Sequence, residues 1–304
     1  MASTKRTIRQ AIYDEKLWRR TVYGSITAAT VRSITSTALG QGGDAPQLYF
    51  GEWVYFPSEA AADQKRRAGM FHSASSRLEH QGPDYSLTGA VVNVASADYF
   101  EVVPYDPVDL INRAITLALT RRCFSLQYDV IVPSGNNRYV IGTAPFDVIS
   151  TMESPEQQIF EVEELLDGTD PATSIWRPWD RDGRTWQPEA DDNVLAVRFE
   201  PAPARNMRIT WKKPYVDLGD DNTATTACPL AYVKWAALVE LYEMLEQRAI
   251  ADGASSSSYR NLKEGFLSKM ILERKKALTV KWGGQVVLRR THAYRTVGPR
   301  HSLR

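Results

Sequence analysis

The segment from residue 225 to residue 277 predicts two long amphipathic helices joined by a short turn. Apolar residues recur three and four positions apart in both halves, which places them on one face of a helix. The first half contains Leu230, Val233, Ala237, Leu241, Met244 and Leu245, widened by Trp235, Leu238 and Tyr242, and the second contains Tyr259, Leu262, Phe266, Met270 and Ile271. Pro229 suits the first helical position, and the Ser-rich residues 252–258 reverse the chain. We therefore expect an antiparallel helix pair that serves packing, because it contains no recognisable catalytic set.

Two shorter helices are predicted upstream. Residues 5–22 place Ile8, Ile12 and Trp18 on one face, with Lys and Arg on the other, and Gly24 is the expected stop. Residues 106–122 begin with Asp106 as the N-cap and Pro107 in the first turn. The buried stripe of that second helix is expected to contain Val108, Ile111, Ile115, Ala118 and Leu119, with Arg121 and Arg122 at its C-terminal end.

The remaining segments have the alternation and turn residues that are typical of β-strands. In the first β-region the predicted strands are Val31–Thr37, Gln47–Phe56, Ala90–Val94 and Tyr99–Val103. In the second they are Asp129–Val132, Arg138–Ile141, Val148–Met152, Ile159–Leu165, Thr173–Trp179, Arg184–Trp186, Val194–Glu200 and Met207–Trp211. Short, evenly spaced strands of this kind are typical of a sandwich or jelly roll.

The expected fold class is therefore α+β. We expect a helical bundle with an inserted antiparallel β-sandwich or jelly-roll-like module and a basic C-terminal extension. The predicted segments are an N-terminal helix at 1–24, a β-rich segment at 25–105, a bundle helix at 106–124, the β-sandwich insertion at 125–220, the helix hairpin at 221–280 and a basic arm at 281–304.

The composition is that of a globular protein, with 43% hydrophobic and 24% charged residues in a chain of 304. A chain of this length can build a large core without disulfides, so Cys123 and Cys228 are interpreted as buried thiols in a reducing compartment. The first residues lead into no apolar segment of the kind found in signal peptides. No run approaches the 18 apolar residues of a membrane span, so no membrane association is expected.

Charge is strongly segregated along the chain although the net charge is only +1. Residues 150–193 contain twelve acidic and three basic side chains, and nine Lys and Arg but no acid follow Glu273. Opposite potentials steer association. The pattern favours contact between molecules, with a merely solvated tail as the alternative.

Three tryptophans cluster between residues 176 and 186. We interpret Asp182 and Gly183 as a tight hairpin turn between two aromatic strands. The alternative is a carbohydrate-stacking surface made by Trp176, Trp179 and Trp186. A calcium loop fits less well, because the glycine is misplaced relative to Asp180 and Asp182.

No motif in the sequence supports catalysis or a cofactor. The chain lacks a P-loop, a G-x-G-x-x-G sequence and a G-x-S-x-G elbow. His72 and His80 are assigned to a polar loop, and His292 and His301 to the basic tail, none with metal-ligand spacing. Adjacent acids such as Glu163–Glu164 and Asp191–Asp192 would diverge in a strand and are interpreted as solvated faces. We therefore expect no enzyme, no metal and no cofactor.

The basic arm is the predicted partner-binding segment. After the helix-breaking Gly283 and Gly284, the sequence reads as a basic strand that could add to another chain. The residues assigned to this contact are Val286, Val287, Leu288, Arg289, Arg290, Tyr294, Arg295, Arg300 and Arg304. Binding to a nucleic acid backbone is the alternative.

Three stretches are similar to a known family. They are the strand and helix at Tyr99–Leu119, the strand pair at Arg138–Ile149, and the acidic turn followed by an alanine-rich helix at Asp220–Tyr242. In layout the chain resembles the head–tail adaptor (connector, or head completion) proteins of tailed bacteriophages, and the likeness covers most of residues 85–275.

This resemblance implies a structural virion protein that is assembled in the host cytoplasm and located in the neck between head and tail. It implies a homo-oligomeric ring, commonly of twelve subunits, beneath the portal protein. The ring would bind tail or neck proteins and let genomic DNA pass without sequence-specific contacts. A carbohydrate-binding or adhesion module of a virion or cell-surface protein remains the alternative function.

Overall fold

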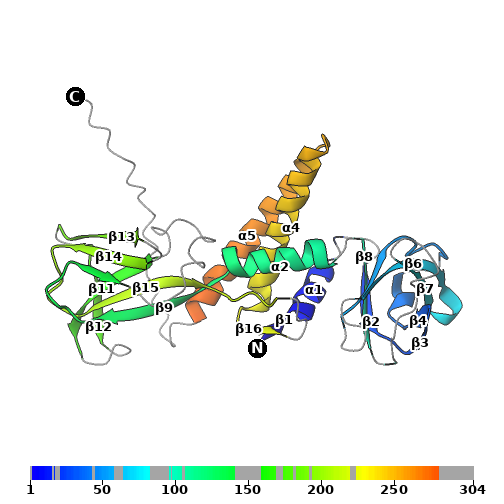
Figure 1. Ribbon diagram of the computed structural model, residues 1–304, viewed down its shortest axis with the longest axis horizontal. Coiled ribbons are helices and arrows are strands. Elements are labelled where there is room, and N and C mark those ends of the chain that lie inside the picture. Colours follow the sequence, from blue (N-terminus) through cyan, green and yellow to red (C-terminus); the bar gives the residue numbers. More distant parts are fainter. Residues whose placement is uncertain are drawn as a thin grey trace.

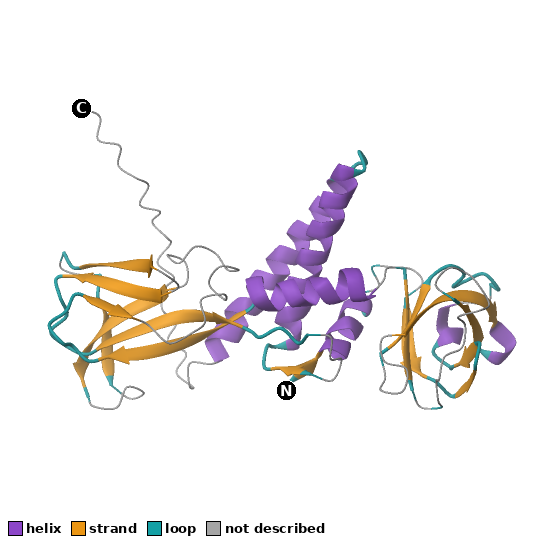
Figure 2. Ribbon diagram, in the orientation of Figure 1, coloured by secondary structure: helices purple, strands orange, loops and turns teal. Residues whose placement is uncertain are grey.

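The computed structural model contains helices and antiparallel sheets, so the α+β fold class is confirmed (Figure 2). It describes residues 2–15, 17, 21–42, 45–57, 64–82, 96, 98–104, 107–140, 159–168, 174–180, 183–191, 194–219 and 224–280. The molecule is elongated, with helices at the centre, a curled sheet at one end and two further sheets at the other (Figure 1). Each of the three parts has its own cluster of buried apolar side chains.

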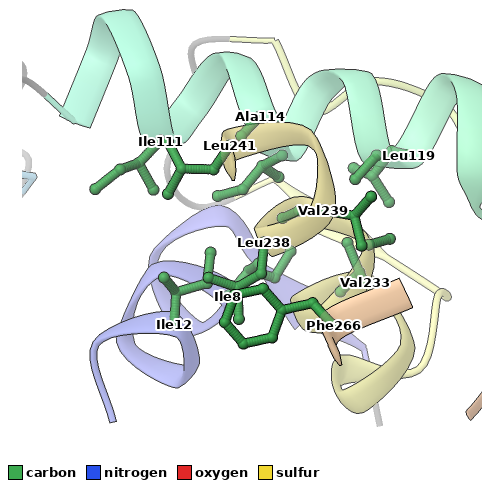
Figure 3. Close-up of a cluster of buried hydrophobic side chains, with 14 of the residues drawn as sticks. Ile8, Ile12, Ile111, Ala114, Leu119, Val233, Leu238, Val239, Leu241 and Phe266 are labelled. Atoms are coloured by element: carbon green, nitrogen blue, oxygen red, sulfur yellow. The ribbon is translucent and has the colours of Figure 1, made fainter. Parts of the chain in front are cut away.

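Four helical segments surround the central core. They are α1 (Lys5–Tyr13), α2 (Arg113–Leu117) with wider π-helical turns on either side (Pro107–Asn112 and Ala118–Arg122), α4 (Leu230–Ala251) and α5 (Ser257–Val280). Figure 3 shows Ile8 and Ile12 of α1, Leu119 after α2, Val233 and Leu238 of α4, and Phe266 of α5 converging on one cluster. The stripes predicted at Ile111, Ile115, Ala118 and Leu119 are buried there, and Val108 lies outside the described side chains.

Helix α1 is shorter than the predicted helix at 5–22. Its start is fixed by a capping box, in which Thr4 Oγ1 accepts from the Thr7 N–H at 3.1 Å and Thr7 Oγ1 accepts from the Thr4 N–H at 2.8 Å. The chain leaves the helix after Tyr13 and forms a strand at Val22–Ser25. The β-propensity of Val22 and Tyr23 and their pairing with another strand override the helical periodicity there.

The predicted helix pair forms α4 and α5, with three corrections at its margins. Pro229 is the N-cap residue of α4 and not its first helical residue. The preceding Thr225–Thr226 is a short strand (β16) that pairs with β1 (Ser3–Thr4). Leu230 and Leu262, both assigned to buried stripes, are exposed, because no described element covers those faces of α4 and α5.

The curled sheet has seven antiparallel strands in the order β2-β8-β5-β6-β7-β4-β3. They are β2 (Val22–Ser25), β3 (Ala28–Thr30), β4 (Ser33–Thr35), β5 (Trp53–Phe56), β6 (Gln64–His72), β7 (Arg77–Gln81) and β8 (Tyr99–Val103). The two edge strands, β2 and β3, are separated by only two residues of chain, so the sheet must curl until its edges approach. Ser36 Oγ donates to the Ser25 carbonyl at 2.7 Å across this closure.

Two strand predictions in this region need adjustment. The prediction at Val31–Thr37 is too long, because Val31 lies in the turn between β3 and β4. The prediction at Gln47–Phe56 holds only for Trp53–Phe56, since residues 47–51 form turns. Ala90–Val94 lies outside the described residues, and Tyr99–Val103 is confirmed as β8.

The other end of the molecule contains a four-stranded sheet, β12-β11-β15-β9, and a three-stranded sheet, β10-β14-β13. Their strands are β9 (Phe124–Ile131), β10 (Arg138–Val140), β11 (Ile159–Asp167), β12 (Ile175–Pro178), β13 (Thr185–Asp191), β14 (Val194–Glu200) and β15 (Met207–Pro214). Val162 and Ile209 from the first sheet and Val197 and Phe199 from the second share one core. Most strand predictions in this region are confirmed within three residues, but β9 begins five residues before the predicted Asp129 and β13 ends five residues after the predicted Trp186. The prediction at Val148–Met152 lies outside the described residues.

Candidate functional site

The two-sheet module contains a pocket of about 210 Å³ that is lined by charged side chains. Glu164 comes from β11 and Arg177 from β12, while Trp179 and Arg184 lie in the segment that leads from β12 to β13. Pro201, Ala202 and Ala204 form an apolar wall after β14, and Arg205 completes the lining. Three arginines and one carboxylate therefore share a single hollow.

Glu164 holds two of these arginines in place. Its side chain is only 4% exposed. Arg184 Nη1 donates to both Glu164 oxygens at 2.9 Å, and Arg177 pairs with the same carboxylate. The Arg184 guanidinium also lies over the Trp179 ring, 4.7 Å from its centre. A buried carboxylate with two guanidinium partners is well compensated, so the arrangement orders both arginines.

The predicted hairpin at residues 176–186 is wrong. Trp176 lies in β12, which pairs with β11, whereas Trp186 lies in β13, which pairs with β14 in the other sheet. The segment between them crosses from one sheet to the other. The Trp179 indole N–H donates to the carbonyl of Thr185, the first residue of β13, at 3.1 Å. Asp182 lies outside the described residues.

The three tryptophans do not form a stacking surface for sugar. Trp176 is 9% exposed and Trp179 is 2% exposed. The Arg208 guanidinium lies over the first ring and Arg184 over the second. Trp186 is half-buried against the core between the sheets. Carbohydrate stacking needs open ring faces, and the two buried rings offer none.

The adjacent acids Glu163 and Glu164 diverge to opposite faces of β11, as expected, but they are not solvated. Glu163 is fully buried and accepts from Arg208 Nε at 2.8 Å across the strand pair β11–β15. Burial of a carboxylate is tolerated when a guanidinium satisfies it. The prediction of solvated faces is therefore wrong for this pair. Asp191–Asp192 lies outside the described side chains.

A second charged cluster joins the helices to the curled sheet. Arg9 of α1 and Glu101 of β8 have fully buried side chains, and Arg9 Nε lies 2.9 Å from Glu101 Oε2. Tyr13 donates to the same oxygen at 2.7 Å, and Arg9 Nη1 donates to Asn112 Oδ1 at 2.8 Å. Burial, together with the Glu101 carboxylate, raises the pKa of the Tyr13 phenol, which keeps it a donor. The cluster is a structural joint, because its charges are satisfied internally.

A third cluster joins two helical segments at the point where the chain enters the two-sheet module. Arg122 pairs with Glu240 and Glu243 on α4, and Tyr232 donates to the Arg122 carbonyl at 2.7 Å. Arg274 of α5 lies 5.8 Å from the ring centre of Phe124, the first residue of β9. The C-terminal turns of α5 therefore lie beside the start of this module.

The hairpin formed by α4 and α5 projects away from the rest of the molecule (Figure 1). Near its tip Ile250 is exposed, and on α5 Leu262 is 43% and Leu272 54% exposed. These side chains make α5 a candidate contact surface. The predicted arm follows directly after α5, and all of its assigned residues, from Val286 to Arg304, lie outside the described part of the chain.

The histidines and cysteines form no metal site among the described residues, where no group of three or more His, Cys, Asp or Glu could hold an ion. His72 and His80 are in strands β6 and β7, not in a polar loop. His80 is buried against the edge of the Phe56 ring, and neither of its ring nitrogens has a hydrogen-bond partner among the described residues. Burial, with the charge of Arg66, lowers the pKa of His80 to about 4. Cys123 and Cys228 are buried free thiols, and burial raises the pKa of Cys123.

The chain matches no model of a known protein family, and a search of curated proteins finds no match. Among the described residues, no helix is both long enough and apolar enough to cross a membrane.

Proposed function

We propose that the chain is a structural assembly protein, the head–tail adaptor of a tailed bacteriophage. Copies of it, commonly twelve, form a ring beneath the portal protein, bind tail or neck proteins and let genomic DNA pass through the lumen. In this proposal the four helical segments form the bundle of each subunit, the two-sheet module is a β-sandwich inserted into it, and the protein performs no catalysis and needs no cofactor. Its location is the neck of the virion.

The observation that carries the proposal is the projecting hairpin with leucines on its outer face. Apolar side chains exposed along a helix favour contact with another helix when several lie on one face. Leu262 and Leu272 are ten positions apart on α5, which places them about 80° apart around the helix axis, on adjoining parts of its exposed side. Helix-on-helix packing between neighbouring copies would cover them. The charge clusters at both ends of the helical centre support a rigid subunit of the kind that a ring needs.

Electron microscopy of the purified full-length protein, alone and with the portal protein of the same phage, tests this proposal. We expect rings with a central opening. Leu262→Glu combined with Leu272→Glu should abolish rings while leaving the circular dichroism spectrum unchanged, because both side chains are exposed in the single chain. Ile175→Glu, at an exposed position on β12, is the matched control and should still form rings. A monodisperse monomer that never joins a particle would exclude the adaptor role.

A further inference from the structure

The pocket at Glu164 carries more positive charge than its own carboxylate can neutralise. Arg177, Arg184 and Arg205 contribute three formal positive charges, and Glu164 contributes one negative charge, which leaves a net charge of +2 at neutral pH. Arg205 is exposed and pairs with no acidic side chain among the described residues. A hollow with this balance attracts an oxyanion.

Donor groups remain for such a ligand. A guanidinium has five N–H donors in a fixed plane. Arg184 directs Nη1 to Glu164, and Arg177 directs Nε and Nη2 to the same group. The other N–H groups of these two arginines have no acceptor among the described residues. Because Glu164 already orders both side chains, a ligand does not have to immobilise them itself.

We propose that this pocket is a receptor for one carboxylate, presented as an Asp or Glu side chain by a partner protein. Arg205 and the free donors of Arg177 and Arg184 bind the carboxylate oxygens, and Pro201, Ala202 and Ala204 pack against the methylene groups of the ligand side chain. The pocket is an interaction site distinct from the α5 surface, and it binds whether or not the chain forms rings.

Two features favour a protein carboxylate over a nucleic acid phosphate. Proteins that bind single strands commonly stack bases on aromatic rings, and here the Trp179 ring is buried beneath Arg184. The wall formed by Pro201, Ala202 and Ala204 is apolar and suits the methylene groups of an Asp or Glu side chain, whereas the oxygens around a phosphate group need polar partners. The pocket, at about 210 Å³, also lies below the roughly 300–1,000 Å³ of sites for larger organic ligands.

The test is an NMR titration of the full-length chain with acetyl-Ala-Glu-Ala-amide, and with acetyl-Ala-Gln-Ala-amide as the neutral counterpart. We expect the Glu peptide to shift the signals of the Trp179 indole N–H and the arginine Nε–H groups in a saturable way, and the Gln peptide to leave them unchanged. Arg205→Ala should weaken binding about tenfold, the loss of one charge-assisted hydrogen-bonded contact. Arg205→Lys, which keeps the charge but not the fork, should weaken it less.

Arg121→Ala is the matched control, because Arg121 is also exposed but lies near the end of the helical segment that contains α2. It should bind the Glu peptide as the wild type does. The proposal is overturned if the Gln peptide produces the same shifts or if Arg205→Ala binds normally. It is also overturned if inorganic phosphate or a single-stranded DNA 20-mer binds these arginines more tightly than the Glu peptide at equal ionic strength, since that outcome assigns the pocket to phosphate.

Discussion

The helical centre has one charged cluster beside each β-module, and the two clusters differ in construction. The joint with the curled sheet is built on Arg9 and Glu101, whose side chains are wholly inaccessible to solvent. The cluster beside the two-sheet module, here called the second joint, links the helical segment that ends at Arg122 to α4. Arg122 is 27% exposed, and its partners Glu240 and Glu243 are 7% and 37% exposed. The first joint therefore spans helix and sheet in full burial, whereas the second spans two helical segments and is partly open to water.

This difference in burial determines how each joint responds to the loss of one partner. Removing one partner of a buried ion pair strands a charge away from water, whereas the partners of an exposed pair can be hydrated instead. The curled sheet should therefore stay fixed to the helices as long as the protein is folded. The second joint should contribute less to stability, because Arg122 and Glu243 remain within reach of water.

Arg9→Met is expected to have the largest effect. The substitution removes the guanidinium that pairs with the buried Glu101 carboxylate and leaves the Tyr13 hydroxyl as its hydrogen-bond donor among the described residues. The free energy of unfolding should therefore fall by about 3–5 kcal/mol. Urea denaturation followed by circular dichroism measures it. Arg6→Met is the matched control on the exposed face of α1, where only a contact with the Tyr99 ring is lost, and should cost less than about 1 kcal/mol. Equal losses of stability in the two variants would show that the buried Arg9–Glu101 pair contributes no more than an exposed contact on α1.

Acid should lower the stability of the curled sheet in particular. The pKa of His80 falls from 6.5 to about 4 on folding, because the neutral ring is buried. A depressed folded-state pKa contributes stability that is complete above pH 6.5 and is lost as the pH falls toward 4. The expected loss over this window is about 2–3 kcal/mol from this residue.

His80→Leu separates this contribution from the titration of the carboxylates. Urea denaturation of wild type and variant at pH 7 and pH 4.5 should show a smaller pH dependence in the variant, by roughly 2 kcal/mol. Amide hydrogen exchange should locate the difference in β5, β6 and β7 and not in β9–β15. If both proteins lose the same stability on acidification, His80 does not sense pH.

Local patterns predicted part of the fold, but four strands of the curled sheet, β2, β3, β6 and β7, were not among the predicted strands. The helix pair, the segment at 107–122 and the strands of the two-sheet module follow from periodicity and turn residues that lie within a short window of sequence. The length of α1 could not be predicted, because Val22 and Tyr23 pair with β8, almost eighty residues away. The burial of Arg9 was missed for the same reason, since a helix-face argument assigns Arg to solvent and the partner Glu101 is remote.

The candidate site was harder to predict. The cluster of tryptophans lies in the region of the pocket, but the local sequence predicted a hairpin there. No local pattern indicated that the chain crosses from one sheet to the other between β12 and β13. Glu163 and Glu164 looked like solvated acids because their partners, Arg208 on one face and Arg177 and Arg184 on the other, are set by strand register. The one available signal was the excess of Arg near Trp in residues 176–184, which is typical of cation–π contacts.

Arg122→Ala should have a moderate effect and tests the more exposed joint. The substitution removes the ion pairs with Glu240 and Glu243, and only Glu240 is largely buried, so we expect a loss of about 1–2 kcal/mol. The neighbouring Arg121→Ala should cost less than about 0.5 kcal/mol, because Arg121 is exposed. A loss as large as that of Arg9→Met would erase the difference between the two joints.

Deletion of residues 281–304 should have the smallest effect on stability and the largest on assembly. Among the described side chains, the last α5 residue packed against the central core is Ala277, so the free energy of unfolding should stay within about 0.5 kcal/mol of the full-length value. Under the adaptor proposal the truncated protein should fold, as judged by circular dichroism, and fail to join particles, as judged by electron microscopy. Normal incorporation would show that the assignment of partner binding to Val286–Arg304 is wrong. A loss of more than about 2 kcal/mol would instead place the arm within the second joint, since α5 ends beside Phe124, and that joint would then be firmer than its ion pairs indicate.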